Sequence, residues 1–197
     1  MYTNRVLTLS DNIFAKDSIF TDAILILTGS LVTAVFAQIS IYLPFSPVPI
    51  TGQTLAVLLV GAVLGSSKGA ISQILYLIEG VIGLPVFAVG HSSISYILGP
   101  TGGYLIGFIF AAFLMGWFSE NGWDRKKLTV AITAFLSNII IYIFGLTWLS
   151  IFFPLNKILT IGFYPFIIGD ILKIFLLIII LPSCWKLISS ISRMKRV

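Results

Sequence analysis

The chain has 197 residues, of which 58% are hydrophobic and only 10% are charged, and its formal net charge is +5. Because soluble domains carry about 25% charged residues, this composition excludes an ordinary soluble globular protein. Because Cys184 is its one cysteine, the chain cannot form an intrachain disulfide or a cysteine metal cluster. From the composition we expect one all-α integral membrane domain over residues 1–197.

Six apolar stretches predict six transmembrane helices. Their predicted bounds are 19–43, 52–66, 69–86, 101–119, 128–152 and 163–187. A helix needs about 20 residues to cross a bilayer. The second stretch is shorter, so we expect the Pro-rich segment before it to pack into the protein at membrane depth.

The first predicted helix carries small residues at four-residue spacing, namely Gly29, Thr33 and Ala37. Small residues in one stripe let a second helix approach closely. The stripe has two interpretations, packing within the bundle or docking of a partner membrane protein.

Two loops between the predicted helices, 43–53 and 83–104, are rich in Gly, Pro and aromatic residues and contain no Lys or Arg. We expect these loops to fold back as lids over a site that is open to the outside. Gln53, where the first of them meets the second helix, is a candidate for ligand contact or for a hydrogen bond between helices.

Three more polar side chains fall inside the predicted spans. Glu79, in the third span, is expected to line a cavity, to pair with Lys173, or to face water near the outer interface. Asn138 and Tyr142 lie four residues apart, on one face of the fifth span. They are candidates for ligand contact, and the alternative is a hydrogen bond that only bridges helices.

The basic residues predict the orientation of the chain. Ten of the twelve Lys and Arg residues fall on one predicted side, Lys157 alone falls on the other, and Lys173 lies inside the last span. Because cytoplasmic loops are rich in Lys and Arg, both termini are predicted to be cytoplasmic in a multi-pass cell-membrane protein. The basic residues are then expected beside membrane lipids. Nucleic acid is not an expected partner, since the sequence has no basic patch interleaved with aromatics.

Asp170 and Lys173 place two opposite charges inside the last predicted helix. At a rise of about 1.5 Å per residue, Lys173 is too deep to reach either membrane surface easily. An ionised group there costs about 2.5–3.5 kcal/mol, and intramembrane charges usually mark functional sites. The pair is either a self-neutralising structural pair or a site in which Lys173 receives a substrate carboxylate. In the second case Asp170 contacts the ligand or keeps Lys173 charged.

The sequence gives little support for catalysis. The stretch GPTGGYLIG (99–107) is not followed by Lys-Ser/Thr, so it is not a phosphate-binding loop. His91 has no second good metal ligand nearby in the sequence, and no nucleophile–base set is evident. We therefore expect neither an enzyme nor a bound cofactor or metal.

Four stretches together resemble the BioY family, the biotin-binding S components of energy-coupling-factor (ECF) vitamin transporters. They are PVPITGQTLAVLLVGAVLG (47–65), GAISQILYLIEGVIGLPVFA (69–88), LGPTGGYLIGF (98–108) and GDILK (169–173). The resemblance implies six helices, a biotin pocket in the outer half of the bundle with lids from the two outer loops, and Asp170 and Lys173 in its wall. It also implies that the small-residue stripe of the first helix docks a transmembrane coupling subunit, and that partner ATPase subunits supply energy.

The chemistry of biotin suits the polar and aromatic candidates. Biotin offers one carboxylate, a neutral ureido ring and an apolar body, which fits a pocket of aromatics with one cation and a few polar groups. The aromatic candidates are Phe87, Tyr96 and Tyr104. The predicted function is biotin capture for uptake. The alternative is a capture subunit for another vitamin or a stand-alone carrier of small solutes.

Overall fold

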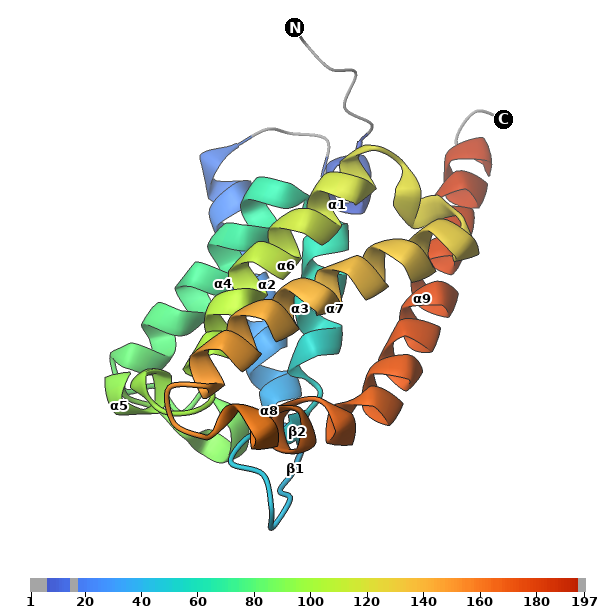
Figure 1. Cartoon of the computed structure of the whole chain (residues 1–197). Coiled ribbons are helices and arrows are strands. Elements are labelled where there is room, and N and C mark those ends of the chain that lie inside the picture. The colour runs from blue at the N-terminus through green and yellow to red at the C-terminus, as the bar shows by residue number, and fades with distance from the viewer. Residues whose placement is uncertain (1–6, 15–17, 195–197) are drawn as a thin grey trace, which may run out of the picture.

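The computed structural model describes residues 7–14 and 18–194, and it is a bundle of helices (Figure 1). The long members are α2 (Ile19–Gln38), α3 (Gln53–Leu64), α4 (Ser66–Val81), α6 (Gly102–Glu120), α7 (Lys127–Leu149) and α9 (Ile167–Met194). One end of the bundle, here the N/C end, holds α1 (Leu9–Ile13), η2 (Trp123–Arg125) and the end of α9. The opposite end, here the loop end, holds β1 (Ser40–Ile41), β2 (Ile50–Thr51), η1 (Ala88–Gly90), α5 (Ile94–Leu98), α8 (Leu155–Gly162) and η3 (Tyr164–Phe166).

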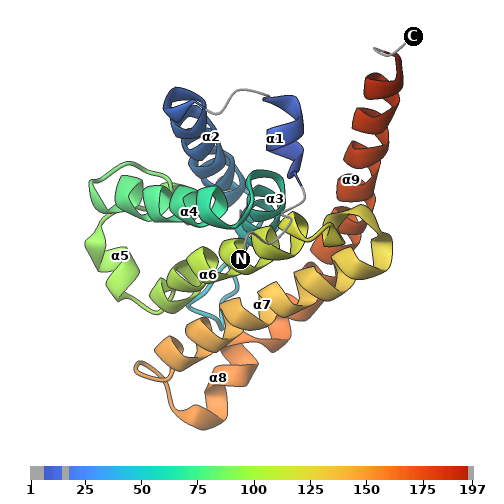
Figure 2. The same ribbon diagram turned by 90° about the horizontal axis from the view of Figure 1, so that it is seen from above.

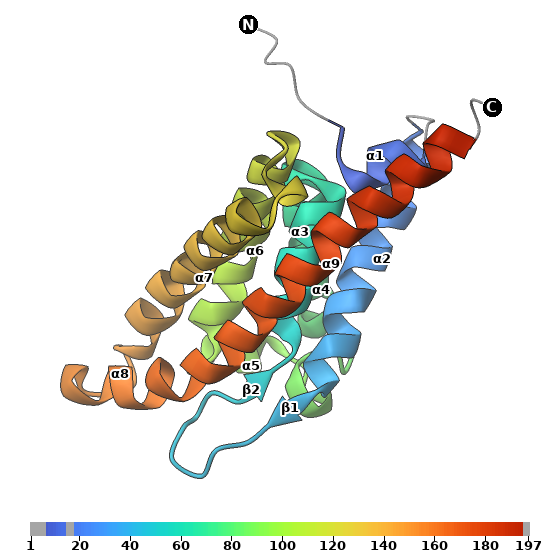
Figure 3. The same cartoon turned by 90° about the vertical axis from the view of Figure 1, so that its right-hand side faces the viewer.

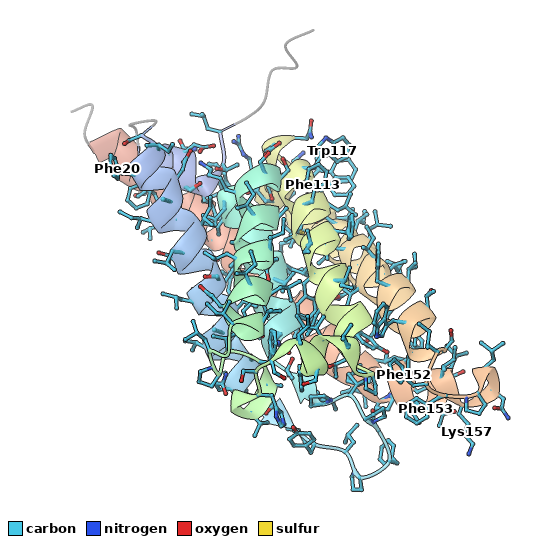
Figure 4. All side chains as sticks on the ribbon, turned by 90° about the vertical axis from the view of Figure 1, so that its left-hand side faces the viewer. Phe20, Phe113, Trp117, Phe152, Phe153 and Lys157 are labelled. Atoms are coloured by element: carbon cyan, nitrogen blue, oxygen red, sulfur yellow. The ribbon has the colours of Figure 1, made fainter. Side chains whose placement is uncertain are left out.

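Four helical segments are long and apolar enough to cross a membrane. They are 19–38, 102–120, 127–149 and the stretch 155–190, which combines α8, η3 and α9; α3 is a shorter apolar helix. Aromatic side chains lie at both ends of the bundle, with Phe20, Phe113 and Trp117 at the N/C end and Phe152 and Phe153 at the loop end (Figure 4). The prediction of a helical integral membrane protein is therefore confirmed.

Several predicted helix bounds are wrong at the loop end, including the end of the third span, which was predicted at residue 86 although α4 ends at Val81. The first span was predicted to reach residue 43, but α2 ends at Gln38 because the chain turns into an antiparallel pairing of Ser40 with Thr51 and Ile41 with Ile50. The fold is thus not purely helical. The last helix begins at Ile167 instead of residue 163, because the short helices α8 and η3 precede it.

The centre of the bundle is α6, which lies between α3 and α4 on one side and α7 on the other (Figure 2). Two glycines permit this close packing. A Cβ on Gly61 of α3 would lie 2.4 Å from the carbonyl oxygen of Ala112, and a Cβ on Gly103 would lie 2.2 Å from the Cβ of Trp148. The helix α9 packs against α3 and α7. It runs obliquely from the loop end to the N/C end of the bundle (Figure 3).

The stripe of Gly29, Thr33 and Ala37 lies inside the bundle. All three residues are buried. A Cβ on Gly29 would lie 2.9 Å from the Cβ of Ser72 in α4, and the Gln73 amide of α4 donates a hydrogen bond of 3.1 Å to the Thr33 hydroxyl. This arrangement agrees with the packing interpretation. Gly29 also lines an apolar groove between α2 and α3, so docking of a partner protein there stays a prediction.

The described basic residues are distributed as the sequence predicted. Lys68, the cluster 125–127, Lys186 and Arg193 lie toward the N/C end, and Lys157 lies at the loop end. Four other residues of the predicted cytoplasmic set, Arg5, Lys16, Lys195 and Arg196, lie outside the described residues.

Ion pairs hold α1, α2 and α4 together at the N/C end. The Lys68 ammonium lies 3.1 Å from Asp11 and 3.3 Å from Asp22. Burial raises the pKa of Asp11, but hydrogen bonds from Thr8 and the Lys68 ammonium lower it by more, so it lies below its usual value. The first turn of α4 is therefore tied to both N-terminal helices.

A second contact ties η2 to α9 at the N/C end. The Trp185 indole donates a 2.6 Å hydrogen bond to Asp124, and the Arg125 guanidinium lies 4.3 Å from the centre of the Trp185 ring. Asp124 is buried, and burial raises its pKa above the usual value although Trp185 and Arg125 oppose the shift.

Trp185→Phe is expected to lower the free energy of unfolding by about 1–3 kcal/mol, because the buried Asp124 carboxylate loses its hydrogen bond. Thermal denaturation in detergent, followed by circular dichroism, measures the change. Trp117→Phe is the matched control, since Trp117 is 46% exposed. Equal denaturation midpoints for the two variants would show that the Trp185–Asp124 contact contributes no stability.

Candidate substrate-binding site

A cavity lies toward the loop end of the bundle, between α3, α6, α7 and α9. Its polar lining residues are Thr51, Gln53, Thr54, Tyr96, Thr101, Tyr104, Asn138, Tyr142, Asp170 and Lys173. Its apolar lining residues are Val48, Pro49, Leu105, Phe108, Ile141 and Phe166. Most of these side chains come from the first two turns of α3, α6 and α9 and from the second half of α7, so helix ends from distant parts of the chain form the site.

Asp170 and Lys173 form an ion pair in the cavity wall. The Lys173 ammonium lies 3.3 Å from Asp170 Oδ1, and the Tyr142 hydroxyl donates a hydrogen bond to Asp170 Oδ2. The ammonium also donates a 2.8 Å hydrogen bond to the Thr54 hydroxyl. A lysine ammonium has three N–H donors, and within the described residues Thr54 and Asp170 accept from two of them, which leaves one for a ligand.

Thr54 was missed by the sequence analysis. It follows Gln53 at the start of α3, where a threonine is typical of a helix N-terminus and carries no sign of an ion-binding role. Its position opposite Lys173 arises because α3 and α9 contact each other, although the two residues lie 119 positions apart in the chain. The polar run Thr51–Gln53–Thr54 was the available signal.

Gln53 is fixed in orientation by two hydrogen bonds. Its amide donates a 2.6 Å bond to the Tyr76 hydroxyl, and its amide oxygen accepts a 2.8 Å bond from Thr51. Tyr76 in turn donates to the carbonyl of Val86 in the loop after α4. Gln53 therefore bridges α3 and α4 by a hydrogen bond and also lines the cavity, and its contact with a ligand stays a prediction.

Asn138, Tyr142 and Tyr104 form the wall on the side of α6 and α7. Asn138 is buried, and its side-chain amide makes no hydrogen bond within the part of the chain that the structure describes. The Tyr104 hydroxyl donates a 2.8 Å bond to the carbonyl of Gly162, and its ring meets the ring of Tyr142 edge-on at 6.5 Å. The Asn138 amide is thus a polar group in the wall that a ligand could use.

The loop after α4 closes the cavity with stacked aromatic rings. Tyr96 of α5 lines the cavity and stacks on Phe87 at 5.2 Å and on His91 at 5.1 Å. Burial raises the pKa of Tyr96 to about 12, so its phenol stays protonated at physiological pH. Phe87 does not line the cavity as predicted. It is fully buried behind Tyr96, with its ring edge against Tyr76.

Glu79 does not lie in the cavity and does not pair with Lys173. Its side chain faces α2, where Ser30 donates a 2.9 Å hydrogen bond to Oε1. Glu79 is only 7% exposed, so it does not face water either. The predictions for Glu79 fail because spacing along one helix does not reveal which neighbouring helix the side chain meets.

Hydrogen bonds tie the two loops at the loop end, 43–53 and 83–104, to the rest of the bundle. Gln38, at the end of α2, donates to the carbonyl of Phe87 and accepts from the backbone N–H of Gly90. Ser46, in the first loop, donates a 2.7 Å bond to the carbonyl of Ile161. The cavity beneath the loops has a volume of about 50 Å³.

The site offers one cation, one carboxylate, two amides and several aromatic rings, which is the composition of a binding pocket. Within residues 7–14 and 18–194, the structure contains no cluster of three or more His, Cys, Asp or Glu residues that could hold a metal ion.

Comparisons with known proteins agree with one another. The sequence model of the BioY family matches residues 8–190. A probable biotin transporter BioY of Pyrococcus horikoshii is 42% identical over 141 residues, which cover 72% of this chain and 82% of the relative. A probable biotin transporter BioY of Rickettsia prowazekii is 31% identical over 201 residues, which cover 100% of this chain and 94% of the relative.

A solved structure shares the fold. It is the crystal structure of the S-component for biotin from an ECF-type ABC transporter, with a TM-score of 0.77 and 29% sequence identity. The match covers 85% of this chain and 92% of that chain.

Proposed function

The chain belongs to the BioY family, and from this premise we propose that it captures biotin as the substrate-binding subunit of an ECF transporter. Such a subunit is part of a transporter and is not an enzyme, since it moves biotin without changing it. Its apolar helices make it a multi-pass protein of the cell membrane.

The observation that carries the proposal is that Lys173 lines the cavity and has one N–H group that makes no hydrogen bond to the described residues. Biotin has one carboxylate, and a charge-assisted hydrogen bond to an ammonium is stronger than a neutral one. Both Asp170 oxygens are already engaged, one by Lys173 and one by Tyr142. Asp170 therefore serves to keep Lys173 charged and oriented, and Lys173 contacts the ligand.

The rest of biotin matches the other lining residues. Its ureido ring has N–H donors and a carbonyl acceptor, which the amides of Asn138 and Gln53 complement. Its apolar ring and tail suit Tyr104, Phe108 and Phe166, which lie in the same cavity wall.

Biotin does not fit the cavity in its present form. Ligand pockets have volumes of about 300–1,000 Å³, whereas this cavity has about 50 Å³. Admission of biotin therefore requires the lining side chains and the two outer loops to move apart. Side-chain hydrogen bonds hold the loops, among them one from Ser46 of the first loop to its neighbour Ile161 and two made by Gln38 to the second loop, and these can break without unfolding a helix.

The proposed orientation places the N/C end in the cytoplasm and the cavity toward the outside, following the basic residues. A transmembrane coupling subunit and ATPase subunits would supply energy for release to the inside. The alternative within transport is a carrier that works alone, or one that takes another vitamin.

Mass spectrometry of ligands that co-purify with the chain tests the substrate. Biotin should be released on denaturation after expression in biotin-containing medium. Release of a different vitamin would overturn the biotin assignment. Uptake in a host that lacks coupling proteins tests the need for partners: no uptake is expected there, and full uptake would establish a stand-alone carrier.

A further inference from the structure

The short helix α8 presents three different sectors around its axis. Successive residues of an α-helix are about 100° apart. Ile158, Ile161 and Gly162 fall on one side and pack against the core or are buried. Leu155 and Leu159 fall on a second side and are exposed, at 75% and 43%.

The third sector of α8 is polar and exposed. It consists of Asn156, Lys157 and Thr160. A helix whose apolar and polar sides are both exposed is typical of the membrane interface, where it lies in the plane with its apolar side in the acyl chains.

The exposed apolar sector continues the lipid-facing surface of the membrane helices. Phe152 precedes α8 in the loop after α7, and Ile168, which is 75% exposed, follows it at the start of α9. Phe152, Phe153 and Lys157 lie together at the loop end of the bundle (Figure 4). Because α7 and α9 belong to membrane-crossing segments, acyl chains are the occupant that fits the Leu155–Leu159 side.

Lys157 occupies the position that suits a lipid phosphate. No carboxylate lies within salt-bridge distance of it in the part of the chain that the structure describes. Lysine side chains near helix ends extend their ammonium groups to the lipid headgroups.

The C-terminal end of α8 is joined by a hydrogen bond to a residue of the cavity wall. The carbonyl of Gly162 accepts the 2.8 Å hydrogen bond from Tyr104, and the carbonyl of Ile161 accepts the 2.7 Å bond from Ser46 of the first outer loop. The ring of Phe163, just after α8, meets Tyr142 edge-on at 4.8 Å. A displacement of α8 would therefore move one wall of the cavity and one of its loops.

We propose that α8 is a membrane-interface helix, with Leu155 and Leu159 in the acyl chains and Lys157 at the lipid phosphates. This seating in the leaflet holds Tyr104 and the first outer loop in place.

Fluorescence quenching by brominated acyl chains tests the seating. Leu159→Cys and Asn156→Cys are made separately in a Cys184→Ser background, labelled with bimane and reconstituted into phosphatidylcholine vesicles. Strong quenching is expected at position 159 and weak quenching at position 156. Equal quenching at both positions would overturn the sector assignment. Quenching at neither would show that protein or water covers this face.

Biotin affinity tests whether the position of α8 in the membrane affects the cavity. This second experiment rests on the proposed function. In vesicles, Leu159→Asp should weaken biotin binding by about tenfold, and its neighbour Thr160→Asp should leave it unchanged. Equal affinities of the two variants would overturn the link. Absence of biotin binding by the unmodified chain would overturn the proposed function instead, and the quenching result would stand independently.

Discussion

Lys173→Met is expected to weaken biotin binding by about 100-fold or more, which corresponds to about 2.7 kcal/mol. Methionine keeps much of the length and apolar stem of lysine but removes the ammonium that faces the cavity. Hydrogen bonds to charged groups contribute about 1.5–3 kcal/mol, and the ligand carboxylate would also meet Asp170 without its cation. Isothermal titration of biotin into the detergent-solubilised protein measures the change.

The matched control for Lys173→Met is Lys186→Met. Lys186 is exposed near the N/C end of α9, far along the helix from the cavity. Its replacement should leave biotin affinity unchanged. If Lys173→Met bound biotin within about threefold of the unmodified protein, the ammonium would not be the carboxylate receptor.

Gly80→Ala is expected to weaken biotin binding by about tenfold, because it displaces the stacked rings of Phe87 and Tyr96. A Cβ at this position would lie 2.0 Å from the ring of Phe87, which is fully buried and cannot move without displacing Tyr96. Overpacking of this kind costs about 1–3 kcal/mol, which outweighs the better helix propensity of alanine. Titration of biotin and the thermal denaturation midpoint would both register the change.

Two further variants separate this effect from a general loss of folding. Gly99→Ala is the milder comparison, because its Cβ would lie 3.3 Å from the carbonyl oxygen of Tyr96, and it should lower biotin affinity much less than Gly80→Ala does. Adding Phe87→Leu to Gly80→Ala removes the ring that clashes and should restore part of the affinity. If the double variant bound more weakly than Gly80→Ala alone, the clash would not be the cause.

Much of the site could be predicted because charged and amide side chains inside a membrane have a high free-energy cost. Asp170 and Lys173 stood out for that reason, and the structure places them together in the cavity wall with Gln53, Asn138 and Tyr142. The i, i+4 spacing of Asn138 and Tyr142 correctly indicated that they share a face of one helix.

The errors share one physical cause, which is that a sequence pattern describes a single helix and not its neighbour. The same limit applies to the stripe at Gly29 and Thr33, for which the sequence left two interpretations open. Both residues contact α4 of the same chain, which agrees with packing within the bundle, and docking of a partner stays a prediction. Glu79 likewise faces α2, and Phe87 supports the cavity wall from behind.

Short elements at the loop end were also beyond prediction. The strands β1 and β2 have two residues each, too few for an alternating pattern. The helix α8 has only eight residues and lies between two predicted spans. Which of its sides faces the protein depends on its contacts with neighbouring elements such as α7, which the sequence does not show.

Binding of radiolabelled biotin to the purified chain tests the central claim most directly. The proposed function predicts saturable binding that unlabelled biotin displaces, that thiamin and riboflavin do not displace, and that Lys173→Met weakens by about 100-fold or more. Absence of saturable binding, or displacement by thiamin or riboflavin as effective as that by biotin, would contradict it.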